Sequence, residues 1–177
     1  FASLTVDRYA QEAARTDQRK GPGTVGFTML GLFGETGSLL AEAKKKQRDA
    51  ASYLGYAPAV TEEIGDVLWY LAAIARRHQL ALSDIAAAAQ TAGATFSVGG
   101  NTALTLHALQ PEHMPQSREP TPAFEHSLLA LAGEVGLLAR QVEGGTSDHQ
   151  WSGYRTTPHK CVRRLPLAAN DSGVTLE

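Results

Sequence analysis

The stretch that decides the fold class is residues 61–71, which read TEEIGDVLWYL. It lies within a longer segment, from about Ala59 to His78, that is typical of a core helix. Two acids, Glu63 and Asp66, stand among the apolar residues of this segment. An acid in apolar surroundings costs free energy unless a cation pairs with it. A divalent metal ion is the simplest such cation, so this helix predicts a chemical site.

Three other segments of the first half also predict helices. The first runs from about Leu4 to Arg19, and a Gly-Pro-Gly turn at residues 21–23 ends it. The second runs from about Phe27 to Lys46, with apolar residues at helical spacing. A short alanine-rich helix opens at Ser83 and runs to about Thr91. No stretch of the first half has a convincing strand pattern, so the sequence predicts an all-α fold.

The second half contains an echo of the first. Residues 131–138 repeat the pattern Leu-x-Gly-Glu-x-Gly-x-Leu of residues 32–39, with Glu134 at the place of Glu35. An internal repeat changes the architecture to be expected, because it suggests a second copy of the same acidic helix. No segment after Glu143 resembles residues 63–71, so we expect this copy to lack a partner helix.

Composition divides the chain into four parts. Residues 1–96 form the predicted helical domain. Residues 97–123 are rich in Gly, Pro, Ser, Thr and Asn, which predicts a linker. Residues 124–145 form the helix that carries the echo, as a possible partial repeat. We expect residues 146–177 to be an irregular tail, because they are polar and locally basic.

Overall composition excludes several classes of protein. The formal net charge of −2 does not suggest a nonspecific nucleic-acid or membrane-surface binder. Cys161 is the single cysteine, which excludes an internal disulfide and is compatible with a reducing compartment. No apolar run approaches membrane-spanning length, and no signal-peptide pattern opens the chain. The six histidines show no paired spacing of the kind that zinc enzymes use. We therefore expect a cytoplasmic globular protein.

The spacing of the acids predicts a metal site. Residues three apart share a helix face, so Glu63 and Asp66 project together. Glu35 lies in the second predicted helix, and Glu42 follows two turns further along the same face. Two such helices packed antiparallel would bring three or four carboxylates around one small cavity. Oxygen ligands favour Mg²⁺ or Mn²⁺, and Mg²⁺ commonly binds substrate phosphates as well. The site therefore points to phosphate-ester or anhydride chemistry.

At these residues the chain resembles the MazG-like nucleoside triphosphate pyrophosphohydrolases, an all-α family. Their signature is Glu-x-x-Glu, a spacer, and then Glu-x-x-Asp. Residues 63–66 match the second half of this signature, and Glu35 matches the first acid of the first half. The resemblance covers about residues 4–89. It implies a MazG-like helical bundle that packs further helices by oligomerisation, as a homodimer or homotetramer.

The resemblance also implies an activity and its residues. The activity is metal-dependent hydrolysis of nucleoside triphosphates, deoxynucleotides or modified nucleotides among them, to the monophosphate and pyrophosphate. Glu35, Glu63 and Asp66 would be the catalytic ligands of Mg²⁺ or Mn²⁺. Lys44 and Lys45 could meet the phosphates, or form a solvated basic helix end. Trp69 is a candidate platform for the base, or a core residue.

Two departures from the family pattern keep other hypotheses open. The second acid of the first motif is Ser38 in this chain, so one expected metal ligand is absent. Family members also tend to carry a Lys and an Asn on the next helix, where residues 86–91 read AAAAQT. A catalytically degenerate nucleotide-binding module is therefore the first alternative. A helical interaction module whose acids are structural is the second.

Overall fold

The computed structural model describes residues 3–19, 24–90, 104–110, 122–143, 157–171 and 174–176. In these ranges the elements follow the order α1 (Val6–Thr16), α2 (Thr24–Asp49), η1 (Ala50–Ser52), α3 (Tyr56–Arg77), α4 (Leu82–Gln90), η2 (His107–Leu109), α5 (Pro122–Glu143) and α6 (Thr157–Asp171). Extended backbone pairs here at one isolated bridge, between Thr5 and Thr105. Each described helix is too short or too polar to cross a membrane. The all-α prediction is confirmed for the described residues.

The four helices predicted in the first half are present, and each begins and ends close to the expected residues. α1 begins after Thr5, whose hydroxyl accepts a hydrogen bond of 3.2 Å from the backbone N–H of Arg8. This cap satisfies a backbone donor that has no partner within the helix. α3 begins at Tyr56, so Pro58 falls in its first turn, where proline removes no helical hydrogen bond.

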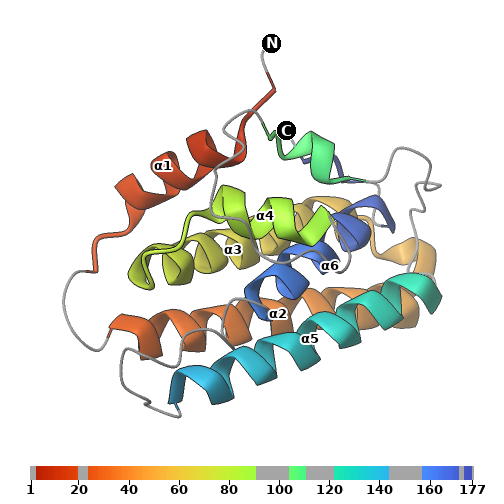
Figure 1. Cartoon of the computed structure of the whole chain (residues 1–177). Helices are drawn as coiled ribbons and strands as arrows, with labels where there is room; N and C mark the ends of the chain where they lie inside the picture. Colours follow the sequence, from red (N-terminus) through yellow and green to blue (C-terminus); the bar gives the residue numbers. More distant parts are fainter. Residues whose placement is uncertain are drawn as a thin grey trace.

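Four helices form the centre of the molecule, arranged as two pairs. Figure 1 shows α2 and α5 lying side by side, with α3 and α6 packed against them. α2 pairs with α3, and α5 pairs with α6, while α1 and α4 cover the outer side of α3 and α6. Both pairs contribute buried side chains to one hydrophobic core, among them Leu32, Leu39, Ile64, Leu131, Leu138 and Val162.

α6 corrects the prediction of an irregular tail over residues 146–177. Arg163 and Arg164 interrupt its apolar pattern, and Pro166 stands inside the helix. For these reasons the local sequence pattern did not predict a helix here. The helix nevertheless packs against α5, α4 and α3. The expectation that the echoed helix has no partner is therefore also wrong. The buried side chains on its apolar face are Cys161, Val162, Leu165, Ala168 and Ala169.

The predicted linker, residues 97–123, lies largely outside the described residues. Its described part, residues 104–110, runs beside the start of α1. The carbonyl of Leu104 accepts a hydrogen bond of 2.8 Å from the backbone N–H of Val6, and the N–H of Leu106 donates to Leu4 at 3.0 Å. Leu104 and Leu106 are buried, and Leu109 is partly buried against the same core. The segment therefore joins the core rather than bridging two separate units.

Ion pairs tie the end of α1 to the end of α3. The buried Asp17 accepts hydrogen bonds of 2.6 Å and 3.1 Å from the guanidinium of Arg77, and it also pairs with Arg76. The hydrogen bonds from Arg77 hold the pKa of Asp17 below its usual value, although burial opposes them. Removing one partner of a buried pair is strongly destabilising. This tie therefore holds the end of α1 against the end of α3.

Candidate functional site

Three carboxylates from two helices converge at one point. α2 and α3 are joined by the short segment of residues 50–55 and pack antiparallel along their lengths. This packing brings Glu35 of α2 opposite Glu63 and Asp66, which share one face of α3. One oxygen of each carboxylate lies within 4.8 Å of the other two. The structure thus brings together the three acids that the sequence singled out, and we call them the acidic cluster.

The acidic cluster has an unbalanced negative charge. Glu35 and Glu63 are half-buried and Asp66 is exposed. The pKa of Glu63 is raised to about 7, mainly by burial. The charge of Glu35, its hydrogen bond to Glu63 and the charge of Asp66 add to this rise. Among the described residues, no lysine, arginine or histidine forms an ion pair with any of the three acids. The cluster therefore favours a proton or a bound cation, and its all-oxygen donor set fits Mg²⁺ or Mn²⁺.

The fourth carboxylate that the spacing allowed does not reach the acidic cluster. Glu42 is buried one helical turn beyond Ser38, on the same side of α2. One of its oxygens accepts a hydrogen bond from the ammonium of Lys45, and the other accepts one from the hydroxyl of Tyr53. Both oxygens are therefore engaged. Ser38 itself is half-exposed on the stripe between Glu35 and Glu42, and it adds no carboxylate.

The two lysines that were candidates for phosphate binding lie in different places. Lys45 pairs with Glu42, and this hydrogen bond together with the charges of Glu42 and Glu63 raises the pKa of Lys45. Its ammonium therefore feels the charge of one acid of the cluster, Glu63, while its hydrogen bond goes to Glu42. Lys44 is exposed, and it lies about 100° around the helix from its neighbour. The structure brings Lys45 to the candidate site and leaves Lys44 away from it.

Trp69 serves the packing of α1 against α3. Its indole N–H donates a hydrogen bond of 2.7 Å to the hydroxyl of Thr16. Its ring meets Tyr70 edge to face, with centroids 4.9 Å apart. These contacts occupy the donor and one edge of the indole, which is how a packed tryptophan is commonly held. They favour the core interpretation of Trp69 over the base-stacking one.

Tyr70 is the aromatic side chain beside the acids. Burial raises its pKa, and so do the charges of Glu35 and Asp66. Its ring lies against Gly31 of α2, where a Cβ atom would overlap the ring. Tyr70 follows Asp66 by four residues, and this spacing is the signal that could have nominated it.

Two further side chains border the site from α1 and the segment after it. The hydroxyl of Tyr9 donates a hydrogen bond of 3.3 Å to the carbonyl of Gly65, next to Asp66. The guanidinium of Arg19 lies 3.7 Å from the centre of the Phe27 ring, and its charge partly opposes the rise in the pKa of Tyr70. No local motif marks these residues, because only the packing of α1 on α3 places them here.

The echoed acid sits in a different environment. Glu134 of α5 faces α6, where its carboxylate lies 3.8 Å from the ammonium of Lys160. The thiol of Cys161 is buried beside them. Burial and the charge of Glu134 raise the pKa of this thiol to about 12. Within the described residues Glu134 joins no group of three possible metal ligands.

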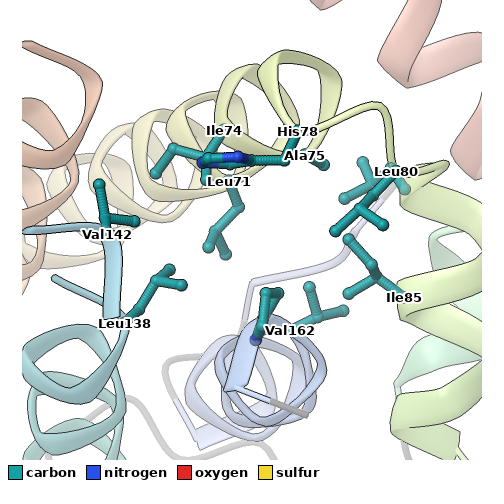
Figure 2. A pocket seen from close by; sticks show the side chains of 11 residues that line it. Leu71, Ile74, Ala75, His78, Leu80, Ile85, Leu138, Val142 and Val162 are labelled. Atoms are coloured by element: carbon teal, nitrogen blue, oxygen red, sulfur yellow. The ribbon is translucent and has the colours of Figure 1, made fainter. Parts of the chain in front are cut away.

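An apolar cavity lies apart from the acidic cluster. Figure 2 shows it between α3, α4, α5 and α6, with His78 at its edge. Burial lowers the pKa of His78, which favours its neutral form. The cavity holds about 10 Å³, enough for at most one water molecule. It is therefore a small packing void and not a second candidate site. Leucine, isoleucine and valine supply most of its lining, with Leu71, Ile74, Ile85, Leu138 and Val162 among them.

Comparison with known proteins adds no relative. The chain matches no protein-family model, no curated protein and no solved structure. What the protein does must therefore be argued from its own side chains.

Proposed function

We propose that this protein is a metal-dependent nucleoside triphosphate pyrophosphohydrolase of the MazG-like kind. The observation that carries the proposal is the convergence of Glu35, Glu63 and Asp66 within 4.8 Å, from two antiparallel helices. These are the positions that match the paired motif of that family. An acidic cluster alone would be weak support. The motif order, the helix pairing and the lack of an ion-pair partner for the three acids among the described residues point the same way.

The reaction would cleave a phosphoric anhydride. The oxygen of a water molecule forms a bond to the α-phosphorus, and the bond from that phosphorus to the oxygen bridging to the β-phosphorus breaks. Pyrophosphate leaves with the electron pair of the broken bond, the nucleoside monophosphate remains, and the water proton passes to a base or to solvent. A bound Mg²⁺ supplies neutralisation of the phosphate charge and activation of the water. The three carboxylates hold the cation, and Lys45 supplies a second positive charge.

The remaining parts of the proposal follow the family resemblance. Mn²⁺ would substitute for Mg²⁺, because both prefer oxygen ligands. Assembly as a homodimer or homotetramer in the cytoplasm is part of the same proposal. α2 carries exposed apolar side chains that such assembly would cover, and Leu30 is the most exposed of them at 74%.

A degenerate module is the second candidate, and one observation favours it. Ser38 stands where the family signature has an acid, so three carboxylates remain where four are expected. A module with fewer ligands would bind Mg²⁺ and nucleotide without turnover. In that case Ser38→Glu would restore a ligand and produce activity.

Pyrophosphate release tests the proposal. We would offer canonical and modified nucleoside triphosphates with Mg²⁺ or Mn²⁺, to the wild type and to Asp66→Asn. Glu62→Gln is the matched control, because Glu62 is an exposed acid next to the cluster on the same helix. The expected result is metal-dependent release that is lost in Asp66→Asn and kept in Glu62→Gln. Release that persists in Asp66→Asn would overturn the proposed site, and no release from folded wild type would favour the degenerate module.

A further inference from the structure

Glu42 is a buried acid that the acidic cluster does not use. It is 6% exposed, and its two oxygens accept hydrogen bonds from Lys45 and Tyr53. Burial by itself would raise the pKa of Glu42, but these hydrogen bonds and the charge of Lys45 lower it. The carboxyl group of Glu42 therefore stays ionised at the edge of the core, where an unpaired charge would cost free energy. Because burying this charge costs free energy, we infer that Glu42 has a specific role.

The role that the contacts suggest is to hold an ammonium in one place. A lysine side chain is flexible and strongly hydrated, so an exposed one is spread over many rotamers. Lys45 is instead fixed at Glu42, while 45% of its side chain remains exposed. Tyr53 braces the carboxylate from the other side, and its ring packs edge to face on Tyr56 at 6.3 Å. Lys45 therefore has one donor committed to Glu42 and its remaining donors free to meet a ligand.

The position of this ammonium relative to the acids defines a direction. Glu35, Ser38, Glu42 and Lys45 follow at three- and four-residue steps along one stripe of α2. Glu42 lies about 10 Å along the helix axis from Glu35, because each residue rises about 1.5 Å. Lys45 reaches back to Glu42, so its ammonium stands at that level, toward the C-terminal end of the helix.

The opposite end of the same stripe is aromatic. Phe27 and Tyr70 lie on the N-terminal side of Glu35, and Arg19 stacks on the Phe27 ring. Aromatic rings and a guanidinium suit a nucleobase, which stacks on flat groups. An ammonium suits phosphate oxygens. The site therefore has a base-like end and a phosphate-like end, with the acidic cluster between them.

We propose that Lys45, positioned by Glu42 and Tyr53, binds the terminal phosphates of the triphosphate, which become the pyrophosphate leaving group. The substrate then lies along α2 with its nucleoside toward Phe27, its α-phosphate at the acidic cluster and its β- and γ-phosphates toward Lys45. This inference rests on the proposed function, since it assigns the orientation of that substrate. It makes Lys45 a binding residue and Glu42 a positioning residue that ligates no metal.

Binding of a non-hydrolysable nucleotide tests the role of Lys45. The probe is an α,β-imido nucleoside triphosphate with Mg²⁺, titrated calorimetrically into wild type, Lys45→Gln and Lys44→Gln. Lys44→Gln is the matched control, because it removes the same charge from the neighbouring residue that lies away from the cluster. We expect Lys45→Gln to weaken binding about tenfold or more, since a charge-assisted hydrogen bond is lost. Lys44→Gln should stay within about twofold of wild type.

The outcomes separate this inference from the proposed function. Equal affinities in the two lysine variants, with tight binding by the wild type, would overturn the assignment of Lys45 and leave the proposed function standing. No Mg²⁺-dependent binding by the wild type would overturn both. The corresponding nucleoside monophosphate adds a second check, because it lacks the terminal phosphates. Its affinity should be the same in Lys45→Gln and in wild type.

Metal affinity and kinetics test the role of Glu42. We expect Glu42→Gln to raise KM about as much as Lys45→Gln while kcat changes little, and Glu42→Asp to recover part of the loss. The affinity for Mn²⁺, measured by electron paramagnetic resonance without nucleotide, should be unchanged in Glu42→Gln and reduced in Asp66→Asn. A loss of Mn²⁺ affinity in Glu42→Gln would show instead that Glu42 is a metal ligand. Unaltered KM in a folded Glu42→Gln would overturn its positioning role.

Discussion

The pair α2/α3 and the pair α5/α6 are built on the same plan and differ at the point where chemistry would occur. Each begins with a helix carrying Leu-x-Gly-Glu-x-Gly-x-Leu, and each packs that helix against the one that follows in the chain. In the first pair Glu35 meets two more acids from α3. In the second pair Glu134 meets Lys160 from α6. The same motif therefore contributes its glutamate to a cluster of three acids in α2 and to a single ion pair in α5.

The buried positions of the two echoed helices correspond to one another. Leu32 and Leu131 are both 0% exposed, and Leu39 and Leu138 are both buried. Leu30 and Leu129 are both exposed, on the opposite side. The repeated sequence thus encodes a repeated packing face. The difference between the pairs lies in the partner helix, because α6 offers a lysine and a buried cysteine where α3 offers Glu63 and Asp66.

This difference teaches that an acid on a helix does not by itself define a site. Glu35 and Glu134 stand at the same place in the repeated pattern, each in the middle of a helix and each with intermediate exposure. The three converging acids repel one another unless a proton or cation is shared among them. The ion pair at Glu134 carries its own counter-charge. What distinguishes the two glutamates is therefore the charge that the neighbouring helix brings.

The largest expected effect is the difference in activity between neutralising Glu35 and neutralising its counterpart Glu134. Glu35→Gln should lower metal-dependent pyrophosphate release at least about 1000-fold, because it removes a ligand of the cation that stabilises the transition state. Glu134→Gln should leave release within about twofold, since it faces Lys160. Rates under saturating Mg²⁺ decide between them. Comparable losses in both variants would mean that the second pair also takes part in the chemistry.

The next effect concerns what the two pairs share. Leu32→Ala and Leu131→Ala should each lower the free energy of unfolding by about 3 kcal/mol, since each empties a fully buried site. Chemical denaturation measures both values. The exposed Leu129→Ala, on the opposite side of α5, should change stability by no more than about 0.5 kcal/mol. A much smaller effect at Leu131 than at Leu32 would contradict the equivalence of the two packing faces.

A smaller effect is expected from the titration of Glu63. Its pKa is raised to about 7 in the folded protein from the ordinary value of 4.5, so the folded state binds this proton more tightly than the unfolded state does. The free energy of unfolding should therefore fall as the pH rises from 4.5 through 7. We expect about 1–2 kcal/mol, allowing for solvent screening of a half-exposed group.

The comparison with Glu63→Gln isolates this effect from other titrating groups. The difference in stability between the wild type and Glu63→Gln, measured without metal at pH 5 and at pH 8, should favour the variant at the higher pH. Adding Mg²⁺ at pH 8 should stabilise the wild type more than the variant. A difference that does not depend on pH would contradict the proton affinity assigned to Glu63.

The smallest effect concerns the ion pair between Glu134 and Lys160 in the pair α5/α6. Lys160→Met should change the free energy of unfolding by only about 0.5 kcal/mol, because the ammonium is half-exposed and 3.8 Å from Glu134. The number of Mn²⁺ ions bound per chain should also stay as in wild type, since one carboxylate is too few to hold the ion. Calorimetry and Mn²⁺ titration measure the two quantities. An additional bound ion would show that Lys160 blocks a second metal site.

Local sequence patterns predicted much of the first half. The helices around Glu35 and Glu63 follow from apolar residues at helical spacing, and the three-residue step predicted that Glu63 and Asp66 share a face. The pattern failed in α6, where Arg163 and Arg164 divide the apolar positions and Pro166 argues against a helix. There the packing against α5, α4 and α3 outweighs the local signal, because burial of a whole face contributes more than the propensity of single residues.

The sequence by itself determined the all-α class, the limits of the first four helices and the pairing of acids on one face of α3. These are local properties, set by hydrogen bonds and side-chain spacing within a few turns. Only the tertiary structure decided that the charge of Glu63 acts on Lys45, that Tyr9 of α1 reaches the backbone beside Asp66, and that Glu134 faces a lysine. Such choices depend on which helix lies opposite, and one-dimensional spacing along a helix carries no information about its neighbour.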